Sequence, residues 1–241
     1  MGDSPVGLPP VNAGGLSQSL GSLVVAVDGT SGSGKSSTCR AVAERLGLRY
    51  LDTGAMYRAV SWWMLQHEVD IYDPAAVAAQ AATPVLVSGT DPRNPTITLD
   101  GVDVSAEIRS DAVNGAVSPV STVPAVRARL VDLQRAIIGA GGIVVEGRDI
   151  GSVVWPEAGL KVYLTADPTA RARRRAAEAG TADVAATQES LLNRDRIDSL
   201  RAVAPLTMAD GAVHIDSTDL TLDEVVDLVV GLATAPADVS P

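Results

Sequence analysis

Gly29-Thr30-Ser31-Gly32-Ser33-Gly34-Lys35-Ser36 is the stretch that decides the fold of this chain. It matches the pattern G-x-x-x-x-G-K-[ST] at every defined position. The glycines let backbone N–H groups converge on a phosphate, and the helix expected after them directs its partly positive N-terminus at the same anion. We therefore predict a phosphate-binding loop over residues 29–37. In it Lys35 reaches the β- and γ-phosphates of a nucleotide and the hydroxyl of Ser36, which precedes Ser37, binds Mg²⁺.

The segments on either side of this loop predict alternating strands and helices. Leu23-Val24-Val25-Ala26-Val27 ends in the turn signal Asp28-Gly29, which is typical of a strand buried on both faces. Further strands are predicted at Arg49-Tyr50-Leu51, Ile143-Val144-Val145, Lys161-Val162-Tyr163-Leu164 and Ala212-Val213-His214-Ile215. Helices are predicted over residues 35–46, 124–138, 168–179 and 188–200. This alternation indicates an α/β fold with a mostly parallel sheet covered on both faces.

One region interrupts the alternation. Val85-Leu86-Val87 and Thr96-Ile97-Thr98-Leu99 flank a turn-rich stretch, and Asp100-Gly101 leads into Val102-Asp103-Val104. This pattern predicts two small hairpins over about residues 84–105, inserted into the α/β core as antiparallel strands. We expect one domain over residues 21–233, with flexible tails rich in small residues and proline at 1–20 and 234–241.

Composition limits the classes of function. The 241 residues include 19 Lys and Arg against 29 Asp and Glu, and the net charge of −10 argues against a general surface for nucleic acid or anionic membranes. No apolar run reaches the roughly 20 residues of a membrane-spanning helix. The single cysteine, Cys39, can form no intramolecular disulfide, which suits a reducing compartment. We expect a cytoplasmic protein that binds neither nucleic acid nor membrane.

Phosphate loops also occur in GTPase switches and in motor or remodelling ATPases. A GTPase reads guanine with an N-K-x-D stretch, and Lys161, the one lysine outside the loop, follows Leu160, so that motif is absent. An ATPase needs a strand that ends in an acidic residue, and Val144-Val145-Glu146 provides one. The sequence leaves that class open, although the short chain and the inserted hairpins favour a small kinase.

Further motifs favour the kinase. They are Asp52-Thr53-Gly54-Ala55-Met56-Tyr57-Arg58, Glu146-Gly147-Arg148-Asp149-Ile150-Gly151, Arg194-Asp195-Arg196-Ile197-Asp198 and Arg201-Ala202-Val203-Ala204-Pro205-Leu206. Together with the phosphate loop they resemble the bacterial cytidylate kinases, over about residues 23–232. The resemblance implies a three-layer P-loop fold with a five-stranded parallel sheet. It also implies an inserted subdomain for the nucleoside monophosphate (NMP) at about residues 54–135 and a mobile helical lid at about residues 171–190.

The resemblance also implies roles for individual residues. The acceptor phosphate would be held by Ser31, Arg58, Arg148 and Arg201, the cytosine edge read by Ser118, Arg127 and Asp149, and the ribose flanked by Arg194 and Asp198. Thr53, where the family often has serine, keeps a hydroxyl in the same substrate site. The physical chemistry agrees, because arginine forks bind a phosphate bidentately and a carboxylate suits the amine of cytosine.

Catalysis is expected to rest on positioning and charge neutralisation, because the acceptor oxygen is already anionic. We assign catalytic roles to Lys35, Arg148, Arg201 and, from the lid, Arg174. The ordinary alternative for the lid cluster Arg171, Arg173, Arg174 and Arg175 is a solvated helix face in which Arg174 pairs with Glu178.

The resemblance therefore implies a Mg²⁺-dependent enzyme that transfers the γ-phosphoryl group of ATP to CMP and dCMP. The residues leave open a kinase for UMP or AMP, and a P-loop ATPase or nucleotide-binding regulator. We expect a monomer whose partners are small-molecule nucleotides.

Overall fold

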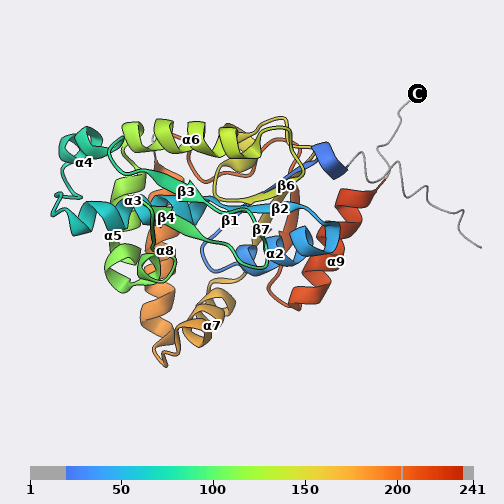
Figure 1. Ribbon diagram of the computed structural model, residues 1–241. Coiled ribbons are helices and arrows are strands. Elements are labelled where there is room, and N and C mark those ends of the chain that lie inside the picture. Colours follow the sequence, from blue (N-terminus) through green and yellow to red (C-terminus); the bar gives the residue numbers. More distant parts are fainter. Residues whose placement is uncertain (1–19, 202, 236–241) are drawn as a thin grey trace, which may run out of the picture.

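The computed structural model of the protein describes residues 20–201 and 203–235 and is built on a parallel sheet (Figure 1). The strands lie in the order β2-β6-β1-β7-β8 and every pairing is parallel. Their bounds are β1 (Val24–Gly29), β2 (Arg49–Asp52), β6 (Ile143–Glu146), β7 (Leu160–Thr165) and β8 (Val213–Asp216). The five predicted strands and their parallel arrangement are confirmed. Because β1 is central, the loop that follows it lies in the middle of the carboxyl edge of the sheet, where α/β folds bind ligands.

Helices cover both faces of the sheet. Successive residues of β1 point to opposite sides, so each face of this strand packs against a different set of helices. Val25 and Val27 pack with the helices α2 (Lys35–Leu46) and α9 (Leu222–Thr234). Val24 and Ala26 pack in a second cluster with α3 (Thr53–Gln66), α5 (Asp111–Ser121) and α6 (Pro124–Ile138). The predicted three-layer arrangement is therefore confirmed.

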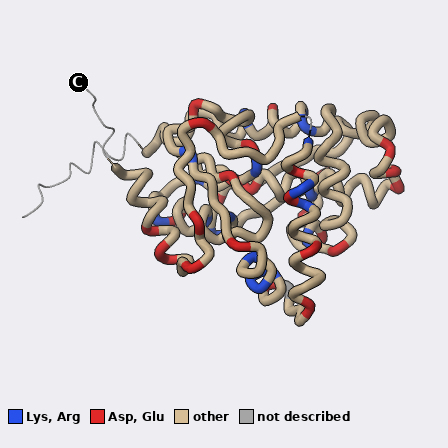
Figure 2. The backbone as a smooth tube through the Cα atoms, turned by 180° about the vertical axis from the view of Figure 1, so that it is seen from behind, with Lys and Arg blue, Asp and Glu red and all other residues tan. Residues whose placement is uncertain are grey.

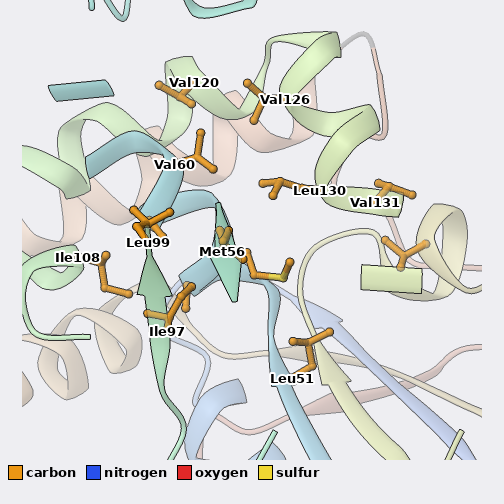
Figure 3. Packing of buried hydrophobic residues seen from close by; sticks show 14 of the residues in the cluster. Leu51, Met56, Val60, Ile97, Leu99, Ile108, Val120, Val126, Leu130 and Val131 are labelled. Carbon is orange, nitrogen blue, oxygen red and sulfur yellow. The ribbon is translucent and has the colours of Figure 1, made fainter. Parts of the chain in front are cut away.

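The predicted hairpins form a separate three-stranded antiparallel sheet. Its strands are β3 (Leu86–Ser88), β4 (Ile97–Leu99) and β5 (Val102–Asp103). Figure 3 shows Ile97 and Leu99 of this insert facing Met56 of α3, with Leu130 of α6 on the other side. The insert is thus fixed to the core by buried apolar contacts, and its β3–β4 turn also accepts a hydrogen bond from the amide of Tyr50 on β2 (2.9 Å to Thr90 O).

Several helix bounds match the sequence prediction and others were missed. The helices at 35–46, 124–138 and α7 (Pro168–Ala179) agree, whereas the predicted helix at 188–200 begins earlier, as α8 (Val184–Leu200). The reason is a cap: the Asp183 side chain accepts from the Ala186 amide at 2.9 Å. The helices α3, α4 (Pro74–Gln80), α5 and α9 were not predicted.

The predicted tails lie outside the described residues except for Leu20, Thr234 and Ala235. Leu20 packs beside the core cluster formed by α2 and α9, and Thr234 is the last residue of α9. The bounds proposed for the NMP-binding subdomain and the lid stay predictions. Over residues 20–201 and 203–235, the helices are all too short or too polar to cross a bilayer.

Candidate functional site

The phosphate loop joins the central strand β1 to the helix α2 and depends on two glycines. Gly29 has φ = 148°, and a Cβ atom built on it would lie 1.9 Å from the carbonyl oxygen of Leu164 on β7. Gly34, at the N-cap of α2, has φ = 90°, a left-handed conformation that favours glycine. The two positions let the loop pass close to the sheet and then turn its backbone toward the axis of α2, as an anion site requires.

Lys35 is the cation at the base of this loop. Its Nζ donates to Thr30 O at 2.6 Å and lies 3.5 Å from Ser33 Oγ, and its side chain is buried. Burial, together with the nearby Arg148, lowers the pKa of Lys35 to about 7. An anion bound in the loop would offset both effects and keep the ammonium protonated.

The hydroxyl of Ser36 faces a buried carboxylate. Ser36 Oγ donates to Glu146 Oε2 at 3.0 Å, and the Tyr50 hydroxyl donates to the other oxygen of Glu146. Burial and the neighbouring Asp52 raise the pKa of Glu146 to about 7, and a cation beside this carboxyl would favour its ionised form. The described residues contain no cluster of three or more metal-ligating side chains.

A cavity of about 670 Å³ opens from the loop and is lined by a second group of cations. Arg58, Arg148, Arg194 and Arg201 all face it. The Nε atoms of Arg58 and Arg194 and the Nη2 atom of Arg201 are buried and have no hydrogen-bond partner among the described residues. Burial, with repulsion from Arg58 and Arg148, lowers the pKa of Arg194 to about 9. Buried guanidinium groups that repel one another are a site for an anion.

Asp198 on α8 organises two of these arginines. Its Oδ2 accepts from Arg148 Nε at 3.0 Å, and its Oδ1 lies 3.7 Å from Arg201 Nη1. Arg148 also donates from Nη2 to Ser31 Oγ at 2.7 Å. The arginine cluster is thus joined directly to the phosphate loop through Ser31.

The cavity is also lined by a carboxylate that a buried arginine holds. Asp149 and Ser118 line the cavity, whereas Arg127 lies behind Asp149 and forms a buried ion pair with it (side chains 3% and 6% exposed for Arg127 and Asp149). The guanidinium of Arg127 also lies 5.5 Å from the ring centroid of Tyr57. Arg127 therefore fixes the orientation of Asp149 in this structure, while Asp149 itself faces the space a ligand would occupy.

The cavity collects most of the predicted site residues. Those that line it are Ser31, Gly32, Gly34, Lys35, Ser36, Ser37, Thr53, Arg58, Ser118, Arg148, Asp149, Arg174, Arg194, Asp198 and Arg201. Those that do not are Gly29, Thr30, Ser33 and Arg127. Their roles toward ligands stay predictions.

The lid arginines are not a uniform solvated face. Figure 2 shows the basic residues of α7 grouped at the lower end of the molecule. In the alternative of a solvated face, Arg174 would pair with Glu178, but Glu178 pairs with Arg175 at 3.3 Å. Arg174 instead points to the loop after β8, where it donates to Ser217 O at 2.6 Å and Thr218 O at 3.2 Å. Its contact with ATP stays a prediction, and Arg171 is buried rather than solvated.

Other polar residues around the site were not predicted. Asp28, at the end of β1, accepts from the amides of Ile150 and Gly151, both at 2.8 Å, and burial raises its pKa to about 6. It therefore anchors the strand-end turn that carries Asp149. The position of Asp28, directly before the phosphate loop, was the signal in the sequence that could have identified it.

A phosphate loop that faces an arginine-lined cavity, on a parallel sheet with an antiparallel insert, defines a P-loop kinase. The family model for cytidylate kinase matches residues 25–235. A cytidylate kinase of Streptomyces avermitilis is 54% identical over 220 residues, covering 90% of this chain and 95% of the relative. One of Streptomyces griseus is 56% identical over 213 residues, covering 88% and 92%. The chain belongs to the cytidylate kinase family.

A shikimate kinase from Acinetobacter baumannii in complex with shikimate aligns with a TM-score of 0.45 at 15% identity, over 90% of this chain and 96% of that chain.

Proposed function

We propose that the protein transfers the γ-phosphoryl group of ATP to CMP or dCMP, giving ADP and CDP or dCDP. The observation that carries this proposal is one cavity with two anion sites, the phosphate loop around Lys35 and the cluster Arg58, Arg148, Arg194 and Arg201. Membership of the cytidylate kinase family supports the choice of acceptor.

On the donor side, the loop amides and Lys35 hold the terminal phosphates of ATP. Ser36 and Glu146 are the residues that would hold Mg²⁺, which when bound neutralises charge on the β- and γ-phosphates. Ser36 and Glu146 both line the cavity beside the phosphate loop. The chain thus supplies cationic and polar groups where charge must be stabilised during transfer.

On the acceptor side, the arginine cluster positions a phosphate whose oxygen is the nucleophile. No strong general base is required, because that oxygen is anionic before it attacks. Arg148 is central, since it contacts Ser31 of the phosphate loop and Asp198 of α8 at the same time. A phosphate bound by Arg148 would therefore lie next to the donor phosphates, and this proximity supplies much of the rate.

Elsewhere in the cavity, Asp149 selects the base of the acceptor. A cytosine presents an amine that donates to a carboxylate, whereas uracil presents a carbonyl oxygen that a carboxylate repels. The buried pair with Arg127 keeps Asp149 in place and favours its ionised form, against the raising of its pKa by burial. Ser118 lines the same cavity, and we propose that its hydroxyl contributes to recognition of the base.

The helix α7 and the start of α8, at about residues 171–190, form the proposed lid over the donor. Arg174 and Arg175 line the cavity from α7, and we propose that Arg174 exchanges the carbonyl oxygens of Ser217 and Thr218 for ATP phosphate as the lid closes. Closure excludes water, which would otherwise accept the phosphoryl group.

The acceptor is tested by measuring ADP release from ATP with CMP, dCMP, UMP, AMP or no acceptor. We expect CMP and dCMP to give the highest kcat/KM because Asp149 pairs with the cytosine amine. Equal rates with and without an acceptor would show an ATPase, and a preference for AMP or UMP would contradict the proposed base recognition.

Replacing Glu146 with glutamine is expected to raise the Mg²⁺ concentration for half-maximal activity by at least about tenfold, because a charge-assisted interaction with the cation is lost. The measurement is a Mg²⁺ titration at fixed CMP and ATP. The exposed carboxylate Glu157 provides a matched control, Glu157→Gln, which should leave the titration unchanged. An unchanged titration for Glu146→Gln would remove Glu146 from the cation site.

A further inference from the structure

Asp195, on α8, is a carboxylate that the reaction above leaves without a role. One of its oxygens, Oδ1, accepts from the backbone amide of Ser31 at 2.8 Å. The other forms an ion pair with Arg171 of α7. The side chain of Asp195 is 13% exposed and that of Arg171 is 4% exposed. Arg171 also donates from Nη1 to Ser31 O at 2.8 Å. The helices α7 and α8 therefore hold both backbone polar groups of one residue in the phosphate loop.

The remaining polar atom of Ser31 faces the acceptor site. Ser31 Oγ accepts from Arg148 Nη2 at 2.7 Å, so the amide, the carbonyl and the hydroxyl of this buried serine are all engaged. The next residue is equally confined: a Cβ atom built on Gly32 would lie 3.3 Å from Leu191 Cδ1 and 3.4 Å from Arg171 Cβ. The start of α7 and the middle of α8 thus lie directly against the loop.

This arrangement divides the amides of the loop between protein and ligand. The amide of Ser31 is taken by a carboxylate of the chain, which leaves the donor phosphates to the later amides of the loop and the N-terminus of α2. Losing the carboxylate would free the Ser31 backbone to move, and with it the hydroxyl that contacts Arg148.

We propose that Asp195 and Arg171 are positioning residues, which hold the backbone of Ser31 so that its hydroxyl and Arg148 present the acceptor phosphate in line with the donor. This inference rests on the proposed transfer to CMP. It assigns the two residues no contact with either nucleotide; they act through Ser31.

The test is a double-mutant cycle on kcat/KM for CMP. Asp195→Ala is expected to lower kcat/KM by about 100-fold in the wild-type background, because small displacements of a reacting group cost this much. In the Ser31→Ala background the same change should add less than about threefold, because the hydroxyl it positions is gone. The control is Asp227→Ala, which removes the partner of Arg45 from an exposed ion pair and should change nothing in either background.

Each outcome decides the proposal. An equal loss in both backgrounds, or no loss in either, overturns it. Should Asp195→Ala fail to fold, Asp195→Asn replaces it in the cycle; it keeps an oxygen for the Ser31 amide but loses the charge that pairs with Arg171, and additive losses again overturn the proposal. A wild-type protein without CMP-dependent ADP release would instead contradict the proposed function itself.

Discussion

Replacing Lys35 with alanine is expected to lower kcat for CMP-dependent ADP formation by about 10³-fold, the scale of losing one preorganised group at a developing charge. Lys35 is buried at the base of the phosphate loop and donates to Thr30 O, so its ammonium is held where the donor phosphates bind. The fold should persist, because burial already disfavours the charged form of Lys35 and alanine removes that cost. Steady-state rates and the Tm of both proteins are the measurements.

The chain offers a matched control for this experiment. Lys161 is the other lysine of the sequence, and its Nζ donates to Asp210 O at 3.1 Å, away from the residues that line the cavity. Lys161→Ala should retain nearly all activity. If Lys35→Ala also retained it, the phosphate loop would not be the donor site.

The sequence allowed the sheet and the loop to be predicted because both depend on local patterns. Short β-branched runs and the glycines of residues 29–34 specify their own conformations, and the structure places them as expected. The missed helices depend on context instead. α5 contains Gly115 and Pro119, which argue locally against a helix, yet Val113, Val117 and Val120 are buried on its inner side. The capping box at Thr221 and Glu224 was a local signal for α9 that could have been used.

The candidate site could be predicted as a set of residues but not as a network. Arginine side chains are long, and sequence spacing does not say which carboxylate each one meets. The resemblance assigns Arg127 to the cytosine edge, and that role stays a prediction; what the sequence does not reveal is its buried ion pair with Asp149. Arg171 was grouped with the lid arginines, whereas it is buried against the phosphate loop. Such pairings arise from contacts between elements that are distant along the chain.

The pairing of Arg127 with Asp149 determines the outcome of a second substitution. Asp149→Ala would leave the Arg127 guanidinium buried without its partner, at a cost of about 3–5 kcal/mol in stability, and would confuse folding with recognition. Asp149→Asn is the sharper change, because it keeps the shape of the side chain. Arg127 can only donate, so it will hold the amide oxygen of the asparagine and turn the NH₂ group toward the cavity.

That orientation places a donor opposite the amine of cytosine. Asp149→Asn is therefore expected to raise the KM for CMP by about 10- to 100-fold, the cost of an unpaired buried donor, with little change in the KM for ATP. It should also raise kcat/KM for UMP relative to CMP, because the carbonyl oxygen of uracil accepts from the new NH₂ group. Initial rates with each acceptor measure both effects, and Asp227→Asn on the surface serves as the control. Equal increases in the KM values for CMP and ATP would show that Asp149 does not read the base.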